Sequence, residues 1–260
     1  MIGALLAGGT GTRLKPMTYV TNKHLLPVYD KPMIAYPLQY LLNAGITEIF
    51  VVTGGEHFDQ VGKLLGSGKK VCEKLGLEGR IDSIAFGVQD GAGGIAEALG
   101  LARKFAGDDS VAVVLGDNIF EDGHVLRGAV KNFESGGHIF LKHVPDKILF
   151  EEKDGMRKAK YGMAELSGRQ VIGIEEKPEK PKSNYAVTGA YVYDNSVFDV
   201  IKTLKPSGRG ELEITDVNNY YVQKGRMHYS IVNGWWTDAG SIDALRRATN
   251  LVWKRVARAD

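Results

Sequence analysis

The sequence has little cysteine, and its histidines lack metal-binding spacings. Cys72 is the one cysteine in 260 residues, which excludes an intramolecular disulfide and a multi-cysteine metal site. The six histidines form no His-x-x-His or His-Glu-x-x-His pattern. No apolar run approaches the roughly 20 residues of a membrane-spanning helix, and the first residues lack the charged start of a secretion signal. These absences predict a cytoplasmic protein with no membrane partner.

The sequence also lacks a large excess of charge of either sign. The 33 lysine and arginine residues are balanced by 31 aspartate and glutamate residues, which leaves a net charge of +2. A nucleic-acid-binding protein usually gathers its basic residues in a patch or stripe. The one modest basic cluster, which we interpret as a solvated helix face, contains Arg246, Arg247, Lys254 and Arg255. We therefore expect no nucleic-acid partner, and 43% hydrophobic with 25% charged residues is a globular composition.

The first half of the chain alternates apolar runs with helical patterns. Short apolar runs bounded by glycine or polar turns predict buried parallel strands at residues 2–7, 49–53, 84–88 and 111–115. Helices are expected between and after them, at about residues 32–44, 59–65, 94–105 and 124–133. This alternation predicts an α/β fold, in which a parallel sheet carries helices on both faces.

From about residue 136 the pattern changes, because strands follow one another with only turns or loops between them. Strands are expected at 139–144, 161–166, 171–176 and 186–193, with an exposed charged loop at 146–160. Helices at 196–204 and 214–224 precede a strand at 228–232 that is expected to return toward the first half. A last helix at 241–256 has Ser241 as its N-cap. The sequence predicts one domain, residues 1–260, with halves at about 1–135 and 136–240 and a C-terminal helix at 241–260.

Glycine is abundant, and three of the 33 glycines stand in a loop directly after the first expected strand. The loop reads Gly8-Gly9-Thr10-Gly11-Thr12-Arg13-Leu14. Glycines expose backbone N–H groups and allow phosphate oxygens to approach closely. No Gly-Lys-Ser/Thr closes the loop as in a Walker motif, and Leu14 stands where a dinucleotide fingerprint has its third glycine. A tight structural turn is the alternative, but Arg13 and Lys23 can both grip phosphate oxygens and favour a triphosphate site.

The loop is one of an ordered set of motifs. It lies within Leu6-Ala7-Gly8-Gly9-Thr10-Gly11-Thr12-Arg13-Leu14 and is followed by Asn22-Lys23-His24-Leu25-Leu26-Pro27-Val28. The later motifs are Gly116-Asp117-Asn118, Glu175-Glu176-Lys177-Pro178, Ser183-Asn184-Tyr185-Ala186-Val187-Thr188-Gly189, Arg209-Gly210-Glu211-Leu212-Glu213-Ile214-Thr215-Asp216 and Trp236-Thr237-Asp238-Ala239-Gly240. They span nearly the whole chain, and together they resemble the signature of sugar-1-phosphate nucleotidyltransferases.

The resemblance implies a fold and a reaction. The fold is a Rossmann-like three-layer sandwich whose predominantly parallel central sheet forms the nucleotide-binding half, joined to a mixed-sheet sugar-binding half. The reaction condenses a pyrimidine nucleoside triphosphate, dTTP first and UTP or CTP as alternatives, with glucose-1-phosphate to give a nucleotide-sugar and pyrophosphate. The resemblance also implies a homo-oligomer. A non-catalytic nucleotide-sugar sensor is the alternative of another class, but a product sensor has no need for triphosphate-binding residues such as Arg13 and Lys23.

Two aspartates match the family's Mg²⁺ ligands. Asp117 follows the expected strand 111–115, at the carboxyl edge where open α/β sheets bind ligands, and Asp238 follows two tryptophans. Mg²⁺ is usually held by one or two carboxylates together with substrate phosphates. Either aspartate alone could be an N-cap or turn residue. The chain has no Asp-x-Asp motif, the common chelating pattern of glycosyltransferases of similar fold, which disfavours that class.

The resemblance assigns the other site residues as well. Arg13 and Lys23 are expected to bind the triphosphate and Lys177 the phosphate of the incoming sugar, and all three are expected to be catalytic, although residues 175–182 could also be a solvated turn. The expected nucleotide-binding residues are Leu6, Gly8, Gly9, Thr10, Gly11, Thr12, Gln89, Gly94 and Asp117. The expected sugar-phosphate-binding residues are Asn118, Tyr161, Gly162, Glu176, Lys177, Val187 and Gly189, and Glu213 resembles a further sugar-pocket position.

Three departures from the family pattern leave the base open. Residues 89–94 read Gln-Asp-Gly-Ala-Gly-Gly where the family usually has Gln-Pro-Ser-Pro-Asp-Gly. Glu97 occupies the place of a frequent glutamine, and His24 replaces the usual glutamine after the signature lysine. A glutamine side chain such as that of Gln89 presents one acceptor and one donor group, so it could pair with thymine, uracil or cytosine.

Overall fold

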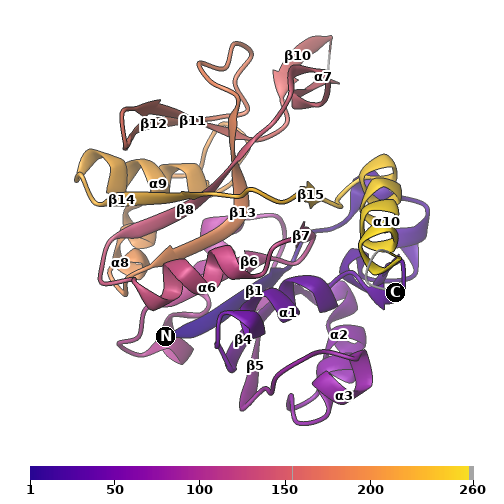
Figure 1. The fold of residues 1–260 in the computed structure, drawn as a ribbon. Coiled ribbons are helices and arrows are strands. Elements are labelled where there is room, and N and C mark those ends of the chain that lie inside the picture. The colour runs from indigo at the N-terminus through magenta and orange to yellow at the C-terminus, as the bar shows by residue number, and fades with distance from the viewer. Residues whose placement is uncertain (154, 258–260) are drawn as a thin grey trace.

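Strands from both halves of the chain share one sheet. In the computed structural model, which describes residues 1–153 and 155–257, nine strands form a mixed sheet with the order β12-β11-β13-β6-β1-β4-β5, and β8 and β14 lie on the other side of β13 (Figure 1). Its strands are β1 (Ile2–Ala7), β4 (Glu48–Gly54), β5 (Ser83–Gln89), β6 (Val111–Leu115), β8 (Gly137–His143), β11 (Gly162–Ser167), β12 (Gln170–Glu176), β13 (Tyr185–Tyr193) and β14 (Met227–Ile231). Parallel pairs join β6, β1, β4 and β5, whereas β13 runs antiparallel to β6 and β8. The change in strand arrangement that the sequence predicts near residue 136 is therefore confirmed.

Helices cover both faces of the sheet. Successive residues of β1 point to opposite faces, so Ile2, Ala4 and Leu6 pack in one cluster while Leu5 and Ala7 pack in another. The first cluster includes residues of α4 (Ile95–Gly100), α5 (Arg103–Ala106), α8 (Val197–Thr203) and α9 (Ile214–Gln223). The second includes residues of α1 (Ala35–Asn43), α2 (Phe58–Leu65), α3 (Val71–Leu75) and α6 (His124–Lys131). The three-layer α/β sandwich predicted from the sequence is confirmed.

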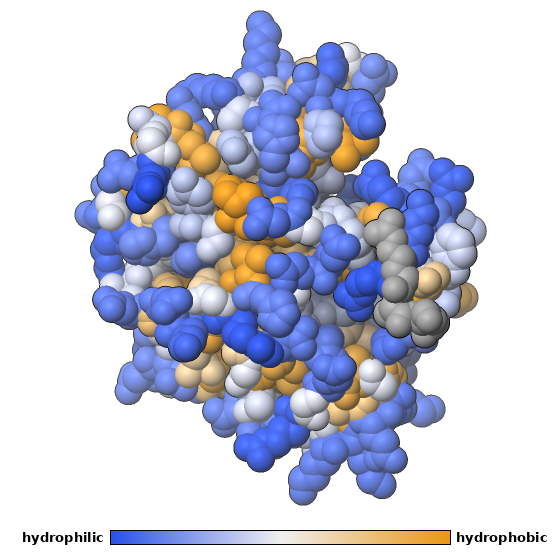
Figure 2. Space-filling view, in the orientation of Figure 1, coloured by the Kyte–Doolittle hydropathy of each residue, from blue (hydrophilic) through white to orange (hydrophobic). Residues whose placement is uncertain are grey.

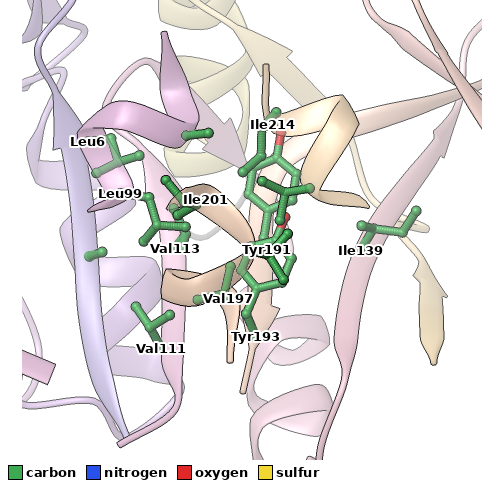
Figure 3. Close-up of a cluster of buried hydrophobic side chains, with 14 of the residues drawn as sticks. Leu6, Leu99, Val111, Val113, Ile139, Tyr191, Tyr193, Val197, Ile201 and Ile214 are labelled. Atoms are coloured by element: carbon green, nitrogen blue, oxygen red, sulfur yellow. The ribbon is translucent and has the colours of Figure 1, made fainter. Parts of the chain in front are cut away.

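The first cluster joins the two halves of the chain. Figure 3 shows Tyr191 and Tyr193 of β13 beside Val113 of β6, with Leu99 and Ile201 from the covering helices. Tyr193 is fully buried, and its hydroxyl donates a hydrogen bond of 2.6 Å to Asn218 Oδ1. Buried apolar area of this kind is the main stabilising contribution to a fold.

Several expected boundaries were wrong. The helix expected from residue 32 begins at Ala35, because Lys31 and Pro32 instead form the short strand β3 opposite β2 (Pro27–Val28). The helix expected at 94–105 is interrupted between α4 and α5. The strand expected to return toward the first half is β14, which pairs in parallel with β8 of the second half.

The charged segment 146–160 was expected to be an exposed loop, and the structure corrects this. It contains α7 (Asp146–Leu149) and a hairpin of β9 (Phe150–Lys153) and β10 (Met156–Ala159). Leu149 and Ala159 are buried at its base, and the guanidinium of Arg157 lies 4.0 Å from the ring centre of Phe150. The buried side chains of Leu149 and Ala159 thus hold this segment in a defined structure, although its charged composition is typical of a loop.

The C-terminal helix α10 (Ile242–Val256) begins as predicted, because the Ser241 side chain accepts a hydrogen bond from the backbone N–H of Ala244. It packs beside β2 and the short strand β15 (Trp236–Asp238), away from the central sheet (Figure 1). Most of the face shown in Figure 2 is hydrophilic, with only small apolar patches. Among the described residues, no helix is long and apolar enough to cross a membrane.

The sheet has an opening at the place where the candidate site lies. Strand β6 ends at Leu115, and β11 meets β13 only at the pair Met163–Ala186. Among the described strands, none pairs with residues 187–189 on that side of β13. Above this opening, β15 pairs antiparallel with β7 (Asn118–Phe120), which directly follows Asp117. The fold therefore brings the carboxyl ends of β1 and β6 to a gap between the two halves.

Candidate active site

A cleft of about 400 Å³ lies at this opening. Small-molecule sites usually measure about 300–1,000 Å³, so its size suits a small substrate. It is lined by all the site residues expected from the sequence except Gly11 and Thr12. The residues come from both halves of the chain.

The glycine loop forms one wall of the cleft. A β-carbon on Gly9 would lie 3.1 Å from Lys23 Cε and Nζ, and one on Gly8 would lie 2.7 Å from Gln89 Oε1. The absence of side chains here lets Lys23 and Gln89 pack against the loop backbone. Gly11 has a left-handed backbone with φ of 67°, and its carbonyl accepts a hydrogen bond of 2.8 Å from the Thr18 hydroxyl. The loop is thus held by Thr18, while Gly8, Gly9 and Thr10 line the cleft.

Lys23 and Asp117 form a close ion pair at the base of the cleft. Lys23 Nζ lies 2.6 Å from Asp117 Oδ2, and Asn118 Nδ2 donates a hydrogen bond of 3.0 Å to Asp117 Oδ1. Burial would by itself raise the pKa of Asp117, but the Lys23 ammonium and these hydrogen bonds hold it well below its ordinary value. Asp117 is therefore ionised at neutral pH.

Asp238 lies beside Asp117, although 120 residues separate them in the sequence. The Asp117 carbonyl accepts a hydrogen bond of 2.8 Å from the N–H of Ala239, next to Asp238. A β-carbon on Gly240 would be 2.7 Å from Asp238 Oδ1 and 3.2 Å from Asp117 Oδ2, so the two carboxylates converge over this glycine. Burial and then the negative charge of Asp117 raise the pKa of Asp238. Arg13 Nη2 is 3.9 Å from Asp238 Oδ2, and the side chain of Arg13 is 58% exposed.

The aspartate pair suits a cation that also takes ligands from substrate. A raised carboxyl pKa caused by a like charge is relieved when a cation binds between the two groups. In the described chain, no three or more His, Cys, Asp and Glu side chains gather into a complete metal site. Mg²⁺ commonly binds through one or two carboxylates with phosphate oxygens and waters completing its shell. The residues present therefore fit such an ion.

Gln89 and Gly94 lie together at the end of β5. Gln89 is 7% exposed, and its Nε2 donates hydrogen bonds to the Gly94 carbonyl at 3.0 Å and to Glu97 Oε2 at 2.7 Å. Gly94 has φ of 95°, and a β-carbon there would lie 2.5 Å from the Leu212 carbonyl oxygen. The departure from the family pattern at residues 90–93 therefore leaves the two expected base-binding positions in contact.

The expected sugar-phosphate residues line the opposite wall. Glu176 ends β12 opposite Gly162 of β11, and its Oε2 accepts a hydrogen bond of 2.7 Å from the Thr215 hydroxyl. Lys177 follows with φ of 47°, a left-handed conformation that is uncommon for residues other than glycine. Backbone strain of this kind is frequent at functional sites. The ring of Tyr161 packs 4.8 Å from that of Trp236.

Asn118 holds the two walls together. Its Oδ1 accepts hydrogen bonds from Gly189 N at 2.9 Å and from Trp236 Nε1 at 2.7 Å, while its Nδ2 donates to Asp117. A β-carbon on Gly189 would lie 2.5 Å from the Asn118 side chain, so this contact requires glycine. Substrate can therefore reach Asn118 only through the second N–H of its amide.

Two charged side chains that hold residues in or next to the cleft were missed by sequence reasoning. Arg209 Nη2 lies 2.8 Å from Glu213 Oε2 and 3.5 Å from Glu176 Oε1, so one guanidinium orients two carboxylates of the cleft. Arg209 and Glu213 lie in one motif, but both precede α9, so helical spacing could not have indicated this pair. Lys142 Nζ donates to the carbonyls of Val232, Asn233 and Gly234 at 3.0, 3.1 and 2.7 Å, just before β15. No local signal in the sequence indicates the contacts of Lys142.

The fold and the cleft define an α/β protein with a glycine loop and paired carboxylates at the carboxyl ends of its strands. Residues 2–255 match the family described as Nucleotidyl transferase, and the chain belongs to this family. It is 42% identical over 257 residues to glucose-1-phosphate thymidylyltransferase of Mycobacterium tuberculosis, covering 97% of this chain and 82% of that one. The corresponding protein of Actinoplanes sp. is 40% identical over 257 residues, covering 97% and 78%.

Solved structures show the same fold, and one of them also supports the family. A Bacillus anthracis protein, described as a candidate glucose-1-phosphate thymidylyltransferase and crystallised with sucrose, has a TM-score of 0.83 and 48% identity, covering 96% of this chain and 94% of that one. A UDP-glucose pyrophosphorylase complexed with UDP-glucose shares the fold, with a TM-score of 0.81 and 23% identity over 98% of this chain and 100% of that one. The family, the fold and the nucleotidyltransferase class predicted from the sequence are confirmed. Enzymes of this family generally use a divalent metal ion.

Proposed function

We propose that the protein transfers a thymidylyl group from dTTP to glucose-1-phosphate. An oxygen of the sugar phosphate attacks the α-phosphorus, the bond from that phosphorus to the β-phosphate oxygen breaks, and pyrophosphate leaves. One observation carries the proposal: the cationic and carboxylate groups around the glycine loop and the Glu176–Lys177 pair line the same cleft. The names of the relatives support glucose-1-phosphate and dTTP as the pair of substrates.

The chain's own residues bind and align the substrates. The attacking phosphate is already ionised at neutral pH, so no protein nucleophile or general base is required. The loop N–H groups, Arg13 and Lys23 bind the triphosphate, and Lys177 places the attacking phosphate opposite the leaving pyrophosphate. Holding two reactants in line and stabilising the developing negative charge are the main catalytic effects available here. The exposed guanidinium of Arg13, held only loosely by Asp238, is free to contact phosphate oxygens.

Asp117 and Asp238 would hold the divalent ion, which we propose to be Mg²⁺. Their converging oxygens and the raised pKa of Asp238 support this. When bound, the ion supplies positive charge to phosphate oxygens that become more negative during transfer. Lys23 keeps Asp117 ionised before any cation binds, so the ligand is ready at neutral pH.

The organisation proposed for the chain follows from this placement. Residues 1–135 bind the nucleotide and residues 136–240 bind the sugar phosphate. Of the helix predicted at 241–260, the structure describes α10 (Ile242–Val256), which packs beside β2 and β15, while residues 258–260 lie outside the described part of the chain. We propose a cytoplasmic homo-oligomer, in line with the expectation from the sequence.

A substrate panel tests the function. Pyrophosphate release is measured with dTTP, UTP, CTP, ATP and GTP, each with glucose-1-phosphate and Mg²⁺, and reactions without sugar phosphate serve as blanks. We expect turnover with dTTP or UTP and little with the purine triphosphates, whose two-ring bases need more room beside Gln89 and Gly94 than a pyrimidine does. Comparable rates with ATP would refute the pyrimidine proposal. Tight binding of nucleotide-sugar without turnover of any pair would identify a sensor instead.

A further inference from the structure

The side chain of Lys23 covers the oxygen of Asp117 that faces the other aspartate. Lys23 Nζ lies 2.6 Å from Asp117 Oδ2, while Asp117 Oδ1 accepts a hydrogen bond of 3.0 Å from Asn118 Nδ2. Oδ2 is the atom that converges with Asp238 over Gly240, so it is the oxygen of Asp117 that an ion held by both carboxylates would use. An ammonium group of the protein therefore lies on the proposed metal ligand itself.

The position of this ammonium group conflicts with a divalent ion. Mg²⁺ binds carboxylate oxygens at about 2.0–2.1 Å, so an ion on Oδ2 would lie within about 5 Å of Lys23 Nζ. Like charges this close repel strongly. The side chains of Lys23 and Asp117 are 13% and 12% exposed, so solvent screens this repulsion little. A divalent ion can therefore bind Asp117 well only after the ammonium group has moved.

The surroundings of Lys23 let its ammonium group move while the backbone stays in place. Residues 23–25 form a short 3₁₀ helix whose N-cap, Asn22, accepts a hydrogen bond from the N–H of His24. The lysine side chain itself is a flexible four-carbon stem. A β-carbon on Gly9 would lie 3.1 Å from both Cε and Nζ of Lys23, so the end of the stem already lies against the glycine loop. Rotation about its last bonds carries the ammonium group along the loop, where the triphosphate would lie.

From these contacts we propose that Lys23 stands in for the divalent ion in the free protein. Its ammonium group neutralises Asp117 and weakens binding of the ion until phosphate oxygens at the glycine loop draw the ammonium group away and uncover Oδ2. One positive charge serves the carboxylate first and the triphosphate second, so the ion and the triphosphate bind with positive coupling. Displacement by a triphosphate rests on the proposed function, whereas competition between Lys23 and the ion at Asp117 does not.

The test measures Mn²⁺ binding to the nucleotide-free protein through the loss of the free-ion signal in electron paramagnetic resonance. Mn²⁺ takes the oxygen ligands that suit Mg²⁺. We expect Lys23→Gln and Lys23→Met to bind one ion about tenfold or more tightly than the wild-type protein, because the aspartate pair gains a full negative charge. Lys177→Met, which removes a cation from the opposite wall of the same cleft, is the matched control and should bind Mn²⁺ like the wild-type protein.

Two further variants locate the ion. Adding Asp117→Asn to Lys23→Gln should abolish the tighter binding, because the ion then loses its uncovered ligand. Lys23→Arg keeps the positive charge and should bind Mn²⁺ as weakly as the wild-type protein. Urea unfolding with EDTA and with Mn²⁺ gives a second measurement, since a ligand of the folded state stabilises it according to its affinity. A neutral variant that is unfolded in EDTA should refold with Mn²⁺ at a concentration that leaves the wild-type stability unchanged.

The outcomes separate this inference from the proposed function, because no substrate is present. A wild-type protein that binds Mn²⁺ as tightly as Lys23→Gln overturns the inference, and so does tighter binding that survives Asp117→Asn or that Lys177→Met shows equally. Failure of Mn²⁺ to stabilise either neutral variant overturns it as well. A wild-type protein that releases no pyrophosphate with any substrate pair, while Lys23→Gln gains Mn²⁺ binding, refutes the proposed function and supports the inference.

Discussion

Replacing His24 by glutamine should make the protein less sensitive to acid. His24 is 1% exposed, and its Nδ1 lies 2.7 Å from Asn22 Oδ1. Burial and then the positive charge of Lys23 lower the pKa of His24 from 6.5 to about 3. In the folded protein the ring stays neutral down to that pH, whereas in the unfolded chain it is protonated below about 6.5. The stability that neutral His24 contributes is therefore complete above pH 6.5 and is lost as the pH falls toward 3.

The size of the effect follows from the two pKa values. Between pH 7.5 and pH 5, the unfolded state gains a proton at His24 that the folded state does not, which costs about 2 kcal/mol of unfolding free energy. Glutamine can still donate a hydrogen bond to Asn22 Oδ1 but does not titrate. His138, whose pKa is lowered to about 4 by burial and then by His228, remains in both proteins, so its contribution cancels in the comparison.

Urea unfolding with EDTA at pH 7.5 and pH 5 measures this difference. The wild-type protein should lose about 2 kcal/mol more than His24→Gln over this interval. His124→Gln, at the exposed start of α6, should behave like the wild-type protein. Equal losses in the wild-type protein and His24→Gln would show that His24 is not held neutral in the folded state and would refute the reasoning.

Three further predictions concern the cleft. Lys177→Ala should lower kcat/KM for glucose-1-phosphate by about tenfold to a hundredfold, while calorimetric binding of dTTP stays unchanged; an unaltered kcat/KM would make residues 175–182 a surface turn. Asp117→Asn and Asp238→Asn should each lower kcat by about a hundredfold or more, and the double variant should be little worse than the poorer single one. Effects that multiply would mean that the two aspartates do not share an ion. Lys142→Met removes the donor to three carbonyls before β15. It should lower the free energy of unfolding in urea by about 1–3 kcal/mol and raise the Mg²⁺ concentration needed for half-maximal rate. An unchanged Mg²⁺ requirement would show that Lys142 does not position Asp238.

The sequence by itself determined the elements whose signal is local. The apolar runs at residues 2–7 and 111–115 became β1 and β6, in which six and four successive residues are buried, as expected for interior strands. Ser241 caps α10 because its hydroxyl reaches an N–H three residues ahead. The glycine loop could likewise be predicted, because its glycines follow a strand directly in the chain.

The tertiary structure decided what depends on residues far apart in the chain. Asp117 and Asp238 meet because β7 and β15 pair, and no local pattern states that pairing. Asn118 Oδ1 accepts hydrogen bonds from Gly189 N and Trp236 Nε1, which lie 71 and 118 residues further along the chain. Long-range contacts of this kind are selected by the packing of the whole core, in which each strand pairing is stabilised by the helices that cover it. The sequence therefore indicated the residues of the cleft, while their ionisation, their hydrogen-bond partners and the orientation of their side chains depend on the folded chain.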